Sequence, residues 1–547
     1  MNSRRFGTRL ALPLPVLNLC VALWLLALLN VPFWRTLWQA VEGWDASRAV
    51  YLVSLPVFVV LWVWLALECL TWGRAAKPVL GILLLLSAAA AYYMNAYAVV
   101  FDRTMITNIM DTDHAESLEL VNLKLIVWLL VLGVVPIFLL SRVYVPRYSW
   151  RRKLITKALT LGVLIVSVIV VVAPFFHSYA TLLSTHHELR LFLVPTNYLS
   201  AAHAYVKARM AVPIRLEQMG TDATRSSIGA AGSKPRLTVL VIGETARAAN
   251  FTLNGYSRAT TPQLSAEAEL INFRQVRSCG TSTAVSLPCL FLDGGRSAFS
   301  DTLASRRENL LDVLQRAGLT VLWRDNNSGC KELCDRVPRD DLTVAKVAAL
   351  CGNGECHDEI LLYGLQDKLD TFDRDTVVVL HMKGSHGPAY HLRYPATFEH
   401  FKPVCTTTQF DRCEHETIVN AYDNTLRYTD HVLAQTIALL RRNTGRFDTA
   451  MIYVSDHGES LGERGLYLHG LPYSIAPTEQ THVPMLMWLS QATESRLGID
   501  AACLRGKQDE ALSHDNFYHS VLGLTGVQTK AYRAERDMFR SCRGATL

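Results

Sequence analysis

Long apolar stretches dominate the first third of the chain, and alternating apolar and polar segments follow them. Five stretches each approach the ~20 residues that a helix needs to cross a bilayer core, and they are Leu14 to Trp34, Val50 to Leu70, Val79 to Val99, Leu123 to Leu140 and Leu154 to Phe176. Buried core helices are the alternative, but five such helices in succession without a polar face are unusual in a soluble core. The pattern predicts a membrane domain of five transmembrane helices over residues 1–180.

Basic residues in the short loops predict the orientation of these spans. They precede the first span and lie between the second and third and between the fourth and fifth, at Arg4, Arg5, Arg9, Arg74, Lys77, Arg142, Arg147, Arg151, Arg152 and Lys153. The amino terminus is therefore predicted to be cytoplasmic, and an odd number of spans places everything after Phe176 on the far side. The first span resembles a signal peptide, but it lacks a clear small-residue cleavage site and is expected to be retained.

From Leu237 onward, apolar β-branched runs alternate with helical patterns. The predicted strands are Leu237 to Ile242, Leu319 to Trp323, Thr376 to Leu380, Ala450 to Val454 and Met485 to Leu489. The helices between them include Glu308 to Ala317 and Glu416 to Arg442. This alternation predicts an α/β domain over residues 235–547, with a mostly parallel sheet and helices on both of its faces.

Two kinds of segment connect or interrupt these domains. Residues 181–234 contain a predicted amphipathic helix, Asn197 to Met210, and a Gly- and Ser-rich stretch, Gly220 to Lys234, which is typical of a flexible linker. The loop from Asp102 to Asn122 predicts a short helix at the outer membrane face. Its polar residues at i, i+4 and i+8 share one helical face, which is alternatively only a solvated face, and these residues are Asn108, Thr112 and Glu116.

Charge and cysteine content refine this picture of a membrane protein. The formal net charge of +6 needs no nucleic-acid partner, because much of it belongs to the loops beside the spans. Of the 12 cysteines, Cys20 and Cys69 fall in membrane segments, and the others form the couples Cys279/Cys289, Cys330/Cys334, Cys351/Cys356, Cys405/Cys413 and Cys503/Cys542. An even count in a translocated domain indicates disulfides in an oxidising compartment such as a bacterial periplasm. Structural zinc sites are the alternative, although no couple has CxxC spacing.

Polar side chains follow the predicted strands where each strand ends. Glu244 follows the first strand, the segment from His381 to Tyr390 follows the third, and Asp456 with His457 follows the fourth, with His469 a short loop further on. Open α/β sheets place their ligand sites at this edge. Any one of these histidines alone can be structural, but carboxylates, imidazoles and a hydroxyl together suit Zn²⁺, with Mn²⁺ as an alternative and Mg²⁺ less suited.

The segment from Ser278 to Cys289 contains several serine and threonine hydroxyl groups between two cysteines. Such clusters also occur in turns and helix caps, but here the arrangement is that of a nucleophile on a loop pinned by a disulfide. Zinc lowers the pKa of bound water from about 15.7 to about 7, and we expect the same effect on a coordinated Thr283 hydroxyl. Lys331, with Asn327 and Ser328, follows the second strand and is placed to hold phosphate oxygens, an ordinary polar turn being the alternative.

Several of these motifs, in this order, resemble one enzyme family. Gly243-Glu244-Thr245-Ala246-Arg247, the Cys279 to Cys289 segment, the Gly-Ser-His-Gly-Pro core of the His381 to Pro395 block and Ser455-Asp456-His457-Gly458-Glu459-Ser460 are similar to those of the phosphoethanolamine transferases that modify lipid A, including the mobile colistin-resistance enzymes. The resemblance covers essentially the whole chain. It implies an alkaline-phosphatase-type fold and a firmly bound zinc ion held by Glu244, Thr283, Asp456 and His457.

The same resemblance implies further site residues and a reaction. Thr283 is the implied nucleophile, and the donor site is implied to be lined by Asn108, Thr112, Glu116, Ser328, Lys331, His386 and His469. The two histidines in this set are candidates for holding a second zinc ion during turnover. The Cys330/Cys334 couple is absent from some relatives, so the position of Lys331 in those proteins is not a guide to its position here.

The expected activity is a two-step phosphoryl transfer at the bacterial inner membrane by a monomeric protein. Thr283 attacks the phosphorus of phosphatidylethanolamine, diacylglycerol leaves, and a lipid A phosphate then takes the phosphoethanolamine, which implies resistance to polymyxins. An inner-core sugar or another glycan is an alternative acceptor. A membrane-bound phosphodiesterase or sulfatase is another alternative, although Cys279 is not followed by the Cys-x-Pro-x-Arg pattern of sulfatases. A non-enzymatic relative is expected to have lost a metal ligand, and here all four positions are filled.

Overall fold

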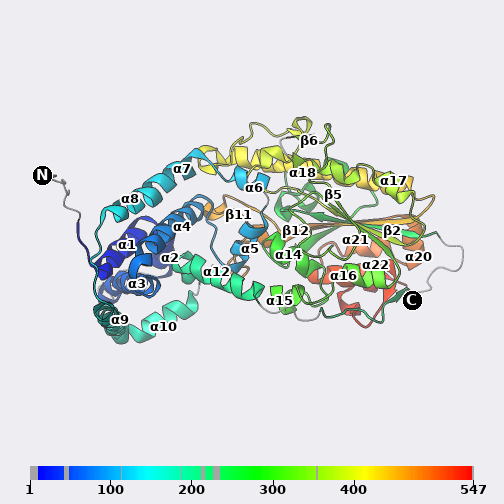
Figure 1. Ribbon diagram of the computed structural model, residues 1–547. Helices are drawn as coiled ribbons and strands as arrows, with labels where there is room; N and C mark the ends of the chain where they lie inside the picture. Colours follow the sequence, from blue (N-terminus) through cyan, green and yellow to red (C-terminus); the bar gives the residue numbers. More distant parts are fainter. Residues whose placement is uncertain are drawn as a thin grey trace. The chain divides into compact units, whose positions relative to one another are not determined.

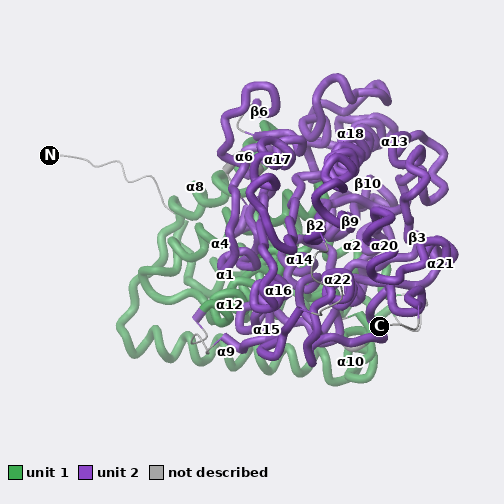
Figure 2. The backbone as a smooth tube through the Cα atoms, turned by 90° about the vertical axis from the view of Figure 1, so that its right-hand side faces the viewer, with its two compact units in different colours: residues 1–107, 121–209 green, residues 108–120, 210–547 purple. Residues whose placement is uncertain are grey.

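The computed structural model describes residues 10–41, 49–112, 114–186, 188–210, 216–225, 234–352 and 355–544, with the side chains of residues 114–116 and 184 excepted. The chain forms two compact units (Figure 2). The first consists of residues 1–107 and 121–209, and the second of residues 108–120 and 210–547. The predicted domain boundaries at residues 180 and 234 stay a prediction.

Apolar helices form the first unit. Among its described residues, four helical segments are long and apolar enough to cross a membrane: Ala49–Leu70, Gly73–Tyr97, Leu123–Arg142 and Trp150–Leu183. The first is α3, and the second contains α4 (Ala76–Tyr97). The third runs from α7 (Leu123–Leu129) to α8 (Val135–Arg142), and the fourth contains α9 (Trp150–Val172) and the start of α10 (Phe176–Thr185). A fifth span exists if the bent pair α1 (Leu14–Leu28) and α2 (Val31–Ala40) is counted as one. The described part of the chain therefore has four to five apolar helices long enough to span a membrane, and the sequence predicted five.

The first predicted span, Leu14 to Trp34, is not one straight helix. Its two halves meet at 70°. Pro32 has no backbone N–H to continue the hydrogen-bond ladder of α1. The buried Asn30 side chain donates instead to the carbonyl oxygens of Leu25, at 2.9 Å, and Val194, at 3.0 Å. These bonds satisfy backbone acceptors at the break, which explains how a bend is tolerated in an apolar sequence.

An eight-stranded sheet lies at the centre of the second unit (Figure 1). Its order is β13-β3-β12-β9-β2-β8-β4-β5, and β12 alone runs antiparallel to both of its neighbours. The strands are β2 (Arg236–Gly243), β3 (Ile271–Arg277), β4 (Thr320–Asp325), β5 (Arg339–Asp341), β8 (Thr376–His381), β9 (Asp448–Ser455), β12 (His482–Leu489) and β13 (Leu512–Ser513). All five predicted strands are present, and the mostly parallel sheet is confirmed.

The central strands β2, β8 and β9 are buried along their whole length because both faces of the sheet are covered by helices (Figure 1). In β2, Leu240 and Ile242 belong to a core that also contains side chains of α16 (Leu310–Arg316) and α22 (Phe517–Thr525). Val239 and Val241 are equally buried and point to the opposite face. That face is covered by α18 (His415–Arg442) in Figure 1.

The parallel register brings three strand ends to one edge. In the pairing of β2 with β9, Gly243 lies opposite Ser455, and in its pairing with β8, Ile242 lies opposite His381. Glu244, Asp456 and Met382 therefore leave the sheet side by side. The backbone N–H groups of Asp456 and Met382 donate to carbonyl oxygens of β2, each at 3.0 Å.

Three connecting features differ in detail from the predictions. The bridging helix is α12 (Thr196–Arg209), and the helix predicted near Asp102 to Asn122 is a pair, α5 (Arg103–Asp111) and α6 (His114–Glu119). The predicted flexible linker begins with ordered structure, because β1 (Thr224–Arg225) pairs with β14 (Val527–Gln528). Two-residue strands leave no periodic signal in a sequence. Residues 226–233 of that linker lie outside the described residues.

Five disulfides join the cysteines of the second unit. They are Cys279–Cys289, Cys330–Cys334, Cys351–Cys356, Cys405–Cys413 and Cys503–Cys542, the same couples that the sequence predicts. Because a metal ligand must be a thiolate, these couples are not structural zinc sites.

Candidate functional site

Three buried side chains meet at the carboxyl edge of the sheet. Glu244, Asp456 and His457 expose 1%, 0% and 0% of their surface, and their ligand atoms lie within 4.8 Å of one another. Nε2 of His457 is 3.2 Å from Oε1 of Glu244 and 3.4 Å from Oδ2 of Asp456. Two carboxylates held this close without water repel each other unless a positive charge lies between them.

Thr283 completes this cluster from the other side. It is the first residue of α14 (Thr283–Leu290), and its hydroxyl donates to Oε2 of Glu244 at 3.0 Å. Its Oγ1 is also 3.4 Å from Nε2 of His457. Thr283 is only half-buried, unlike the other three residues. Thr283 is therefore the most exposed member of the cluster, and the carboxylates and the imidazole are shielded from solvent.

The loop before Thr283 is held by bonds that explain its residue types. The backbone N–H of Gly280 donates to Oγ of Ser286 at 2.7 Å, and the Thr281 hydroxyl donates to the carbonyl of Leu471 at 2.6 Å. A Cβ on Gly280 would lie 2.7 Å from Cγ1 of Val285, so only glycine fits there. The crowded hydroxyls and the disulfide thus fix the position of Thr283 before any substrate binds.

The pKa values of the cluster show how its charges are balanced. Burial and the adjacent charge of Glu244 raise the pKa of Asp456 to about 7. Burial lowers the pKa of His457, but the charge of Asp456 and the hydrogen bond and charge of Glu244 outweigh burial and raise this pKa to about 10. Burial also acts to raise the pKa of Glu244, yet the hydrogen bond and charge of His457 keep it well below its usual value. A protonated imidazole therefore stabilises the carboxylates.

These residues fit a divalent metal ion. Oδ2 of Asp456 is buried and accepts no hydrogen bond from the described residues. Two carboxylates, one imidazole and one hydroxyl form a four-membered oxygen and nitrogen donor set, which matches the coordination number that zinc prefers. A bound cation would supply the positive charge that the imidazolium supplies without it, and it would leave His457 neutral as a ligand.

Two further predicted histidines lie beside this cluster. The ring of His469 is 4.3 Å from the ring of His457 between centroids, and the ring of His386 is 5.5 Å from that of His469. Nδ1 of His469 lies 3.4 Å from Oε2 of Glu459, a fully buried carboxylate whose pKa is raised, chiefly by burial. The sequence prediction did not include Glu459, although it follows His457 by only two positions.

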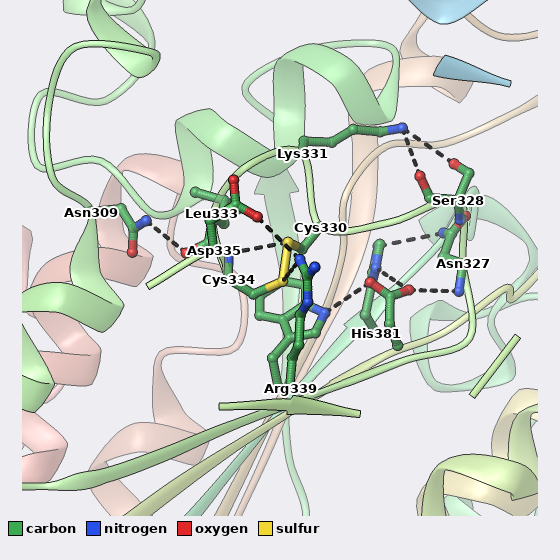
Figure 3. Close-up of a disulfide and its surroundings, with 12 residues drawn as sticks. Asn309, Asn327, Ser328, Cys330, Lys331, Leu333, Cys334, Asp335, Arg339 and His381 are labelled. Carbon is green, nitrogen blue, oxygen red and sulfur yellow. Dashed lines mark hydrogen bonds and ion pairs between the residues drawn. A yellow bond between two sulfur atoms is a disulfide. The ribbon is translucent and has the colours of Figure 1, made fainter. Parts of the chain in front are cut away.

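Ser328 and Lys331 lie on the loop after β4 (Figure 3). Nζ of Lys331 donates to the carbonyl of Ser328 at 3.1 Å and to its hydroxyl at 3.3 Å. Figure 3 shows the lysine extending away from the Cys330–Cys334 disulfide and toward Ser328. The same Nζ is 3.9 Å from Oδ2 of Asp111. The disulfide closes this loop tightly, at a sequence separation of 4.

Asn327 connects this loop to the metal-ligand cluster, and the sequence prediction gave it only a general phosphate-binding role. Its amide donates to Oε2 of Glu244 at 2.8 Å and to the carbonyl of Met382 at 2.9 Å. Beside it, Nδ1 of the buried His381 is 3.2 Å from Oδ1 of Asp325. Burial lowers the pKa of His381, but the charge of Asp325 more than compensates and raises it. His381 is the last residue of β8 and Asn327 is the second residue after β4, so the sequence marks their place near strand ends but does not show which side chains they contact.

Replacing Asn327 with alanine is expected to weaken zinc binding by about 10- to 100-fold, because partners that orient a ligand have effects of this size. Zinc competition with a chromogenic chelator on the purified full chain measures it. Asn326→Ala is the matched control, since the Asn326 amide donates to Cys356 and Asp358 and not to Glu244. Equal affinity in the two variants would contradict the orienting role.

The structure describes only part of the donor-site residues that were predicted on the helix near residues 102–122. Asn108 and Thr112 are one turn apart, and the Thr112 hydroxyl donates to the Asn108 carbonyl at 2.6 Å. Their segment groups with the second unit, where Glu119 forms an ion pair with the buried Arg393 at 2.6 Å. The side chain of Glu116 lies outside the described part of the chain. The role of these three residues stays a prediction.

Comparisons with known proteins point to one kind of enzyme. The family described as phosphoethanolamine transferase EptA/EptB matches residues 57–210, and the family described as sulfatase matches residues 236–527. The chain is 40% identical over 538 residues to phosphoethanolamine transferase EptA of Escherichia coli (strain K12), covering 97% of this chain and 98% of that protein. It is 36% identical over 528 residues to phosphatidylethanolamine transferase Mcr-1 of Escherichia coli, covering 94% and 95%.

A solved structure matches over the same extent. The integral membrane protein lipooligosaccharide phosphoethanolamine transferase A (EptA) from Neisseria meningitidis superposes with a TM-score of 0.92 at 36% identity. The match covers 96% of this chain and 98% of that one, so it includes the apolar helices as well as the sheet domain.

Proposed function

Because this chain belongs to the phosphoethanolamine transferase family, we propose that it transfers phosphoethanolamine from phosphatidylethanolamine to a phosphate of lipid A. The observation that supports this most is the position of the Thr283 hydroxyl, 3.0 Å from Glu244 in a cluster of buried metal-type ligands. A reachable hydroxyl beside such a cluster is what a covalent phosphoryl transfer requires. The relatives named above are described as a phosphoethanolamine transferase and a phosphatidylethanolamine transferase, which agrees with this chemistry.

The proposed cofactor is one zinc ion held by Glu244, Thr283, Asp456 and His457. When bound, zinc lowers the pKa of a coordinated hydroxyl and offsets negative charge that develops on a phosphoryl group. His386 and His469 are the proposed site of a second zinc ion during turnover, because the ring of His469 lies next to that of His457 and the ring of His386 lies next to that of His469.

In the first step, Oγ1 of Thr283 forms a bond to the phosphorus of phosphatidylethanolamine, and the bond from phosphorus to the glycerol oxygen breaks. The hydroxyl proton points at Oε2 of Glu244, its acceptor at 3.0 Å. Ser328 and Lys331 are the proposed ligands of the phosphate oxygens, and the N-terminus of α14 favours negative charge at Thr283. The glycerol oxygen takes up the proton that the Thr283 hydroxyl loses, and diacylglycerol departs.

In the second step, a phosphate oxygen of lipid A attacks the phosphorus on Thr283 and releases the threonine hydroxyl. The transferred amine offsets negative charge on lipid A, which is expected to weaken the binding of polymyxins. We propose that the protein lies in the bacterial inner membrane as a monomer, with a cytoplasmic amino terminus and a periplasmic catalytic domain. Both substrates are lipids, so the apolar helices keep the enzyme where its substrates are.

The sulfatase description of residues 236–527 does not favour sulfatase activity. Cys279 is bonded to Cys289 and is not a free thiol, and it lacks the Cys-x-Pro-x-Arg pattern that sulfatases modify.

Mass spectrometry of lipid A from bacteria with and without the protein tests the proposal. The expected result is a species heavier by one phosphoethanolamine group, present with the wild-type chain and absent with Thr283→Ala. If lipid A is unmodified and an inner-core sugar carries the phosphoethanolamine, the acceptor is that sugar and not a lipid A phosphate. Free phosphoethanolamine without a modified glycolipid would indicate a phosphodiesterase instead.

A further inference from the structure

The imidazole of His514 connects two segments of the site without belonging to the metal-ligand cluster. It is 1% exposed and follows β13 directly. Its Nδ1 accepts a hydrogen bond from the backbone N–H of Cys279 at 3.1 Å, and its Nε2 lies 3.0 Å from the carbonyl oxygen of Ser455. One side chain therefore contacts the start of the Thr283 loop and the end of β9.

These two partners allow only one state of the ring. A backbone N–H can only donate and a carbonyl can only accept, so His514 is neutral, with its proton on Nε2. Burial lowers the pKa of His514 to about 3 and favours the same neutral form. His514 is therefore a fixed bridge between two backbone groups and is not a proton carrier.

The bridge joins two segments whose strands do not pair directly with each other. The Thr283 loop leaves β3, whereas Asp456 and His457 leave β9, and β12 lies between these two strands. No strand ladder therefore joins the two segments directly. Cys279 lies in the loop that leads to Thr283, and Ser455 immediately precedes Asp456. We therefore expect a change in the distance between the Cys279 N–H and the Ser455 carbonyl to change the distance from the Thr283 hydroxyl to Asp456 and His457.

His514 is itself attached to a rigid base. The preceding residue, Ser513, pairs with Arg277 at the end of β3. The following residue, Asp515, accepts a hydrogen bond from the backbone N–H of Arg296 at 2.8 Å. The Asn516 side chain accepts from the Ser513 N–H at 3.0 Å and closes the turn. The ring position is thus set by bonds on both sides of it in the chain.

We propose that His514 is a positioning residue that sets the distance between the nucleophile Thr283 and the ligand pair Asp456 and His457. This inference rests on the proposed function and adds a residue to its machinery. A displacement of about 1 Å in a reacting group can cost about 100-fold in rate. The effect is expected in the chemical step, because the two hydrogen bonds of the His514 ring go to Cys279 and Ser455, beside the nucleophile and the ligand pair.

The test compares His514→Leu, which removes both hydrogen bonds, with His514→Gln, whose amide can accept with one atom and donate with another. On the full chain, His514→Leu is expected to lower kcat about 100-fold, with KM for phosphatidylethanolamine nearly unchanged. His514→Gln is expected to recover about 10-fold of that loss. The visible absorption spectrum of the Co²⁺-substituted protein is expected to shift in His514→Leu and to return toward wild type in His514→Gln.

His519 provides the matched control. It is also fully buried, and its ring bridges two backbone groups in the same way, from the N–H of Arg533 at 3.1 Å to the carbonyl of Asp293 at 3.1 Å. These partners lie outside the site. His519→Leu is expected to lower thermal stability to a similar extent as His514→Leu while leaving kcat of the folded fraction and the Co²⁺ spectrum unchanged.

Three results would overturn the proposal. They are wild-type kcat in His514→Leu, equal kcat losses in His514→Leu and His519→Leu, and a loss confined to KM. If His514→Leu does not fold, a His514→Gln variant that folds with no more activity than an inactive control overturns it as well. Failure of the proposed function is distinguishable, because it shows in the wild-type chain as the absence of a phosphoethanolamine adduct on Thr283.

A second and independent observation is a cavity of about 680 Å³ within the first unit. Most of its lining is apolar and comes from α2, α3, α10 and α12, and it includes Phe33, Leu55, Phe58, Trp62, Tyr179 and Leu182. Leu55 to Trp62 cover roughly 10 Å along the span α3. Arg103, Arg190 and one carboxylate, Asp102, also line the cavity and lie outside the spanning segments, so it combines an apolar lining with charged side chains of net positive charge.

We infer that this cavity binds one diacyl phospholipid, with an acyl chain against α3 and the phosphate near Arg103 and Arg190. Its volume falls within the usual range of single-ligand pockets, so it accommodates one acyl chain with part of the head group while the second chain stays outside it. The charge complementarity between guanidinium groups and a phosphodiester supports this occupant.

Photo-crosslinking tests this in the full chain carrying Thr283→Ala, so that catalysis plays no part. A diacyl phosphatidylethanolamine with a photoactivatable acyl chain, in nanodiscs, is expected to label peptides of α3 and α12. Ala204→Trp, which fills the cavity, is expected to reduce this labelling about tenfold, whereas Val163→Trp on the exposed surface of α9 leaves it unchanged. Uniform labelling of all spans, or labelling that Ala204→Trp does not reduce, would overturn the inference. Preferential labelling by photoactivatable lipid A would show that lipid A, and not a diacyl phospholipid, occupies the cavity.

Discussion

Replacing Thr283 with alanine is expected to abolish phosphoethanolamine transfer while the protein stays folded. Loss of a nucleophile typically costs between about 10³- and 10⁶-fold in kcat. Thr283 is half-buried at the first position of α14, where alanine is well tolerated, so little stability is lost. The rate of lipid A modification by the purified chain, with phosphatidylethanolamine as donor, measures the effect.

Two variants separate the hydroxyl from the loop that carries it. Thr283→Ser keeps the hydroxyl and is expected to retain most of the activity. Thr281→Ala removes a neighbouring hydroxyl whose bond to the Leu471 carbonyl only holds the loop, and it is expected to lose about tenfold at most. A Thr283→Ala variant as active as Thr281→Ala would assign the nucleophile to another residue.

Replacing Asp456 with asparagine is expected to remove the zinc ion and with it at least about 10³-fold of activity. The side chain keeps its size but loses the buried negative charge that a cation requires. Treating the wild-type chain with a chelator is expected to have the same effect, and added Zn²⁺ is expected to reverse it. Elemental analysis of the purified full chain measures the metal directly.

Stability provides a second readout of the same site. Burial and Glu244 raise the pKa of Asp456, so its ionised form is costly in the metal-free protein at pH above about 7. Metal-free Asp456→Asn is therefore expected to melt at or above the temperature of the metal-free wild type at pH 8. Zinc is expected to raise the melting temperature of the wild type only.

Asp430→Asn is the control for a buried carboxylate outside the site. Asp430 accepts hydrogen bonds from the backbone N–H groups of Gln263 and Leu264, and burial raises its pKa to about 6. This variant is expected to bind zinc normally. Asp456→Asn that retains a full equivalent of zinc would contradict the assigned ligand set.

The strands that position the site were predictable because they are buried on both faces. Continuous apolar runs such as Leu237 to Ile242 and Ala450 to Val454 are typical of strands covered by helices on both sides, and the polar residues directly after them mark the carboxyl edge. β3 was missed because Asn272, Arg274 and Gln275 interrupt its apolar residues. The bend at Asn30 was missed because an apolar stretch shows that a helix lies in the membrane but not that it is straight.

The residues missed at the site depend on contacts between distant parts of the chain. Asn327 bonds to Glu244, 83 positions earlier, and this partner is set by the order of β2, β8 and β4. His514 joins Cys279 and Ser455, at sequence separations of 235 and 59. In the sequence, His514 stands in an ordinary polar run, Ser-His-Asp-Asn, and nothing nearby marks it. The clustering of Glu244, Asp456 and His457 could be predicted from strand ends, but the contacts that hold these residues in place could not.

Mass analysis of the purified chain after incubation with phosphatidylethanolamine alone tests the central claim most directly. Without an acceptor lipid, one phosphoethanolamine group is expected to accumulate on the peptide that contains Thr283, and the adduct is expected to disappear when lipid A is added. An adduct on another residue, an adduct that persists in Thr283→Ala, or turnover with no covalent adduct at any time would contradict the account.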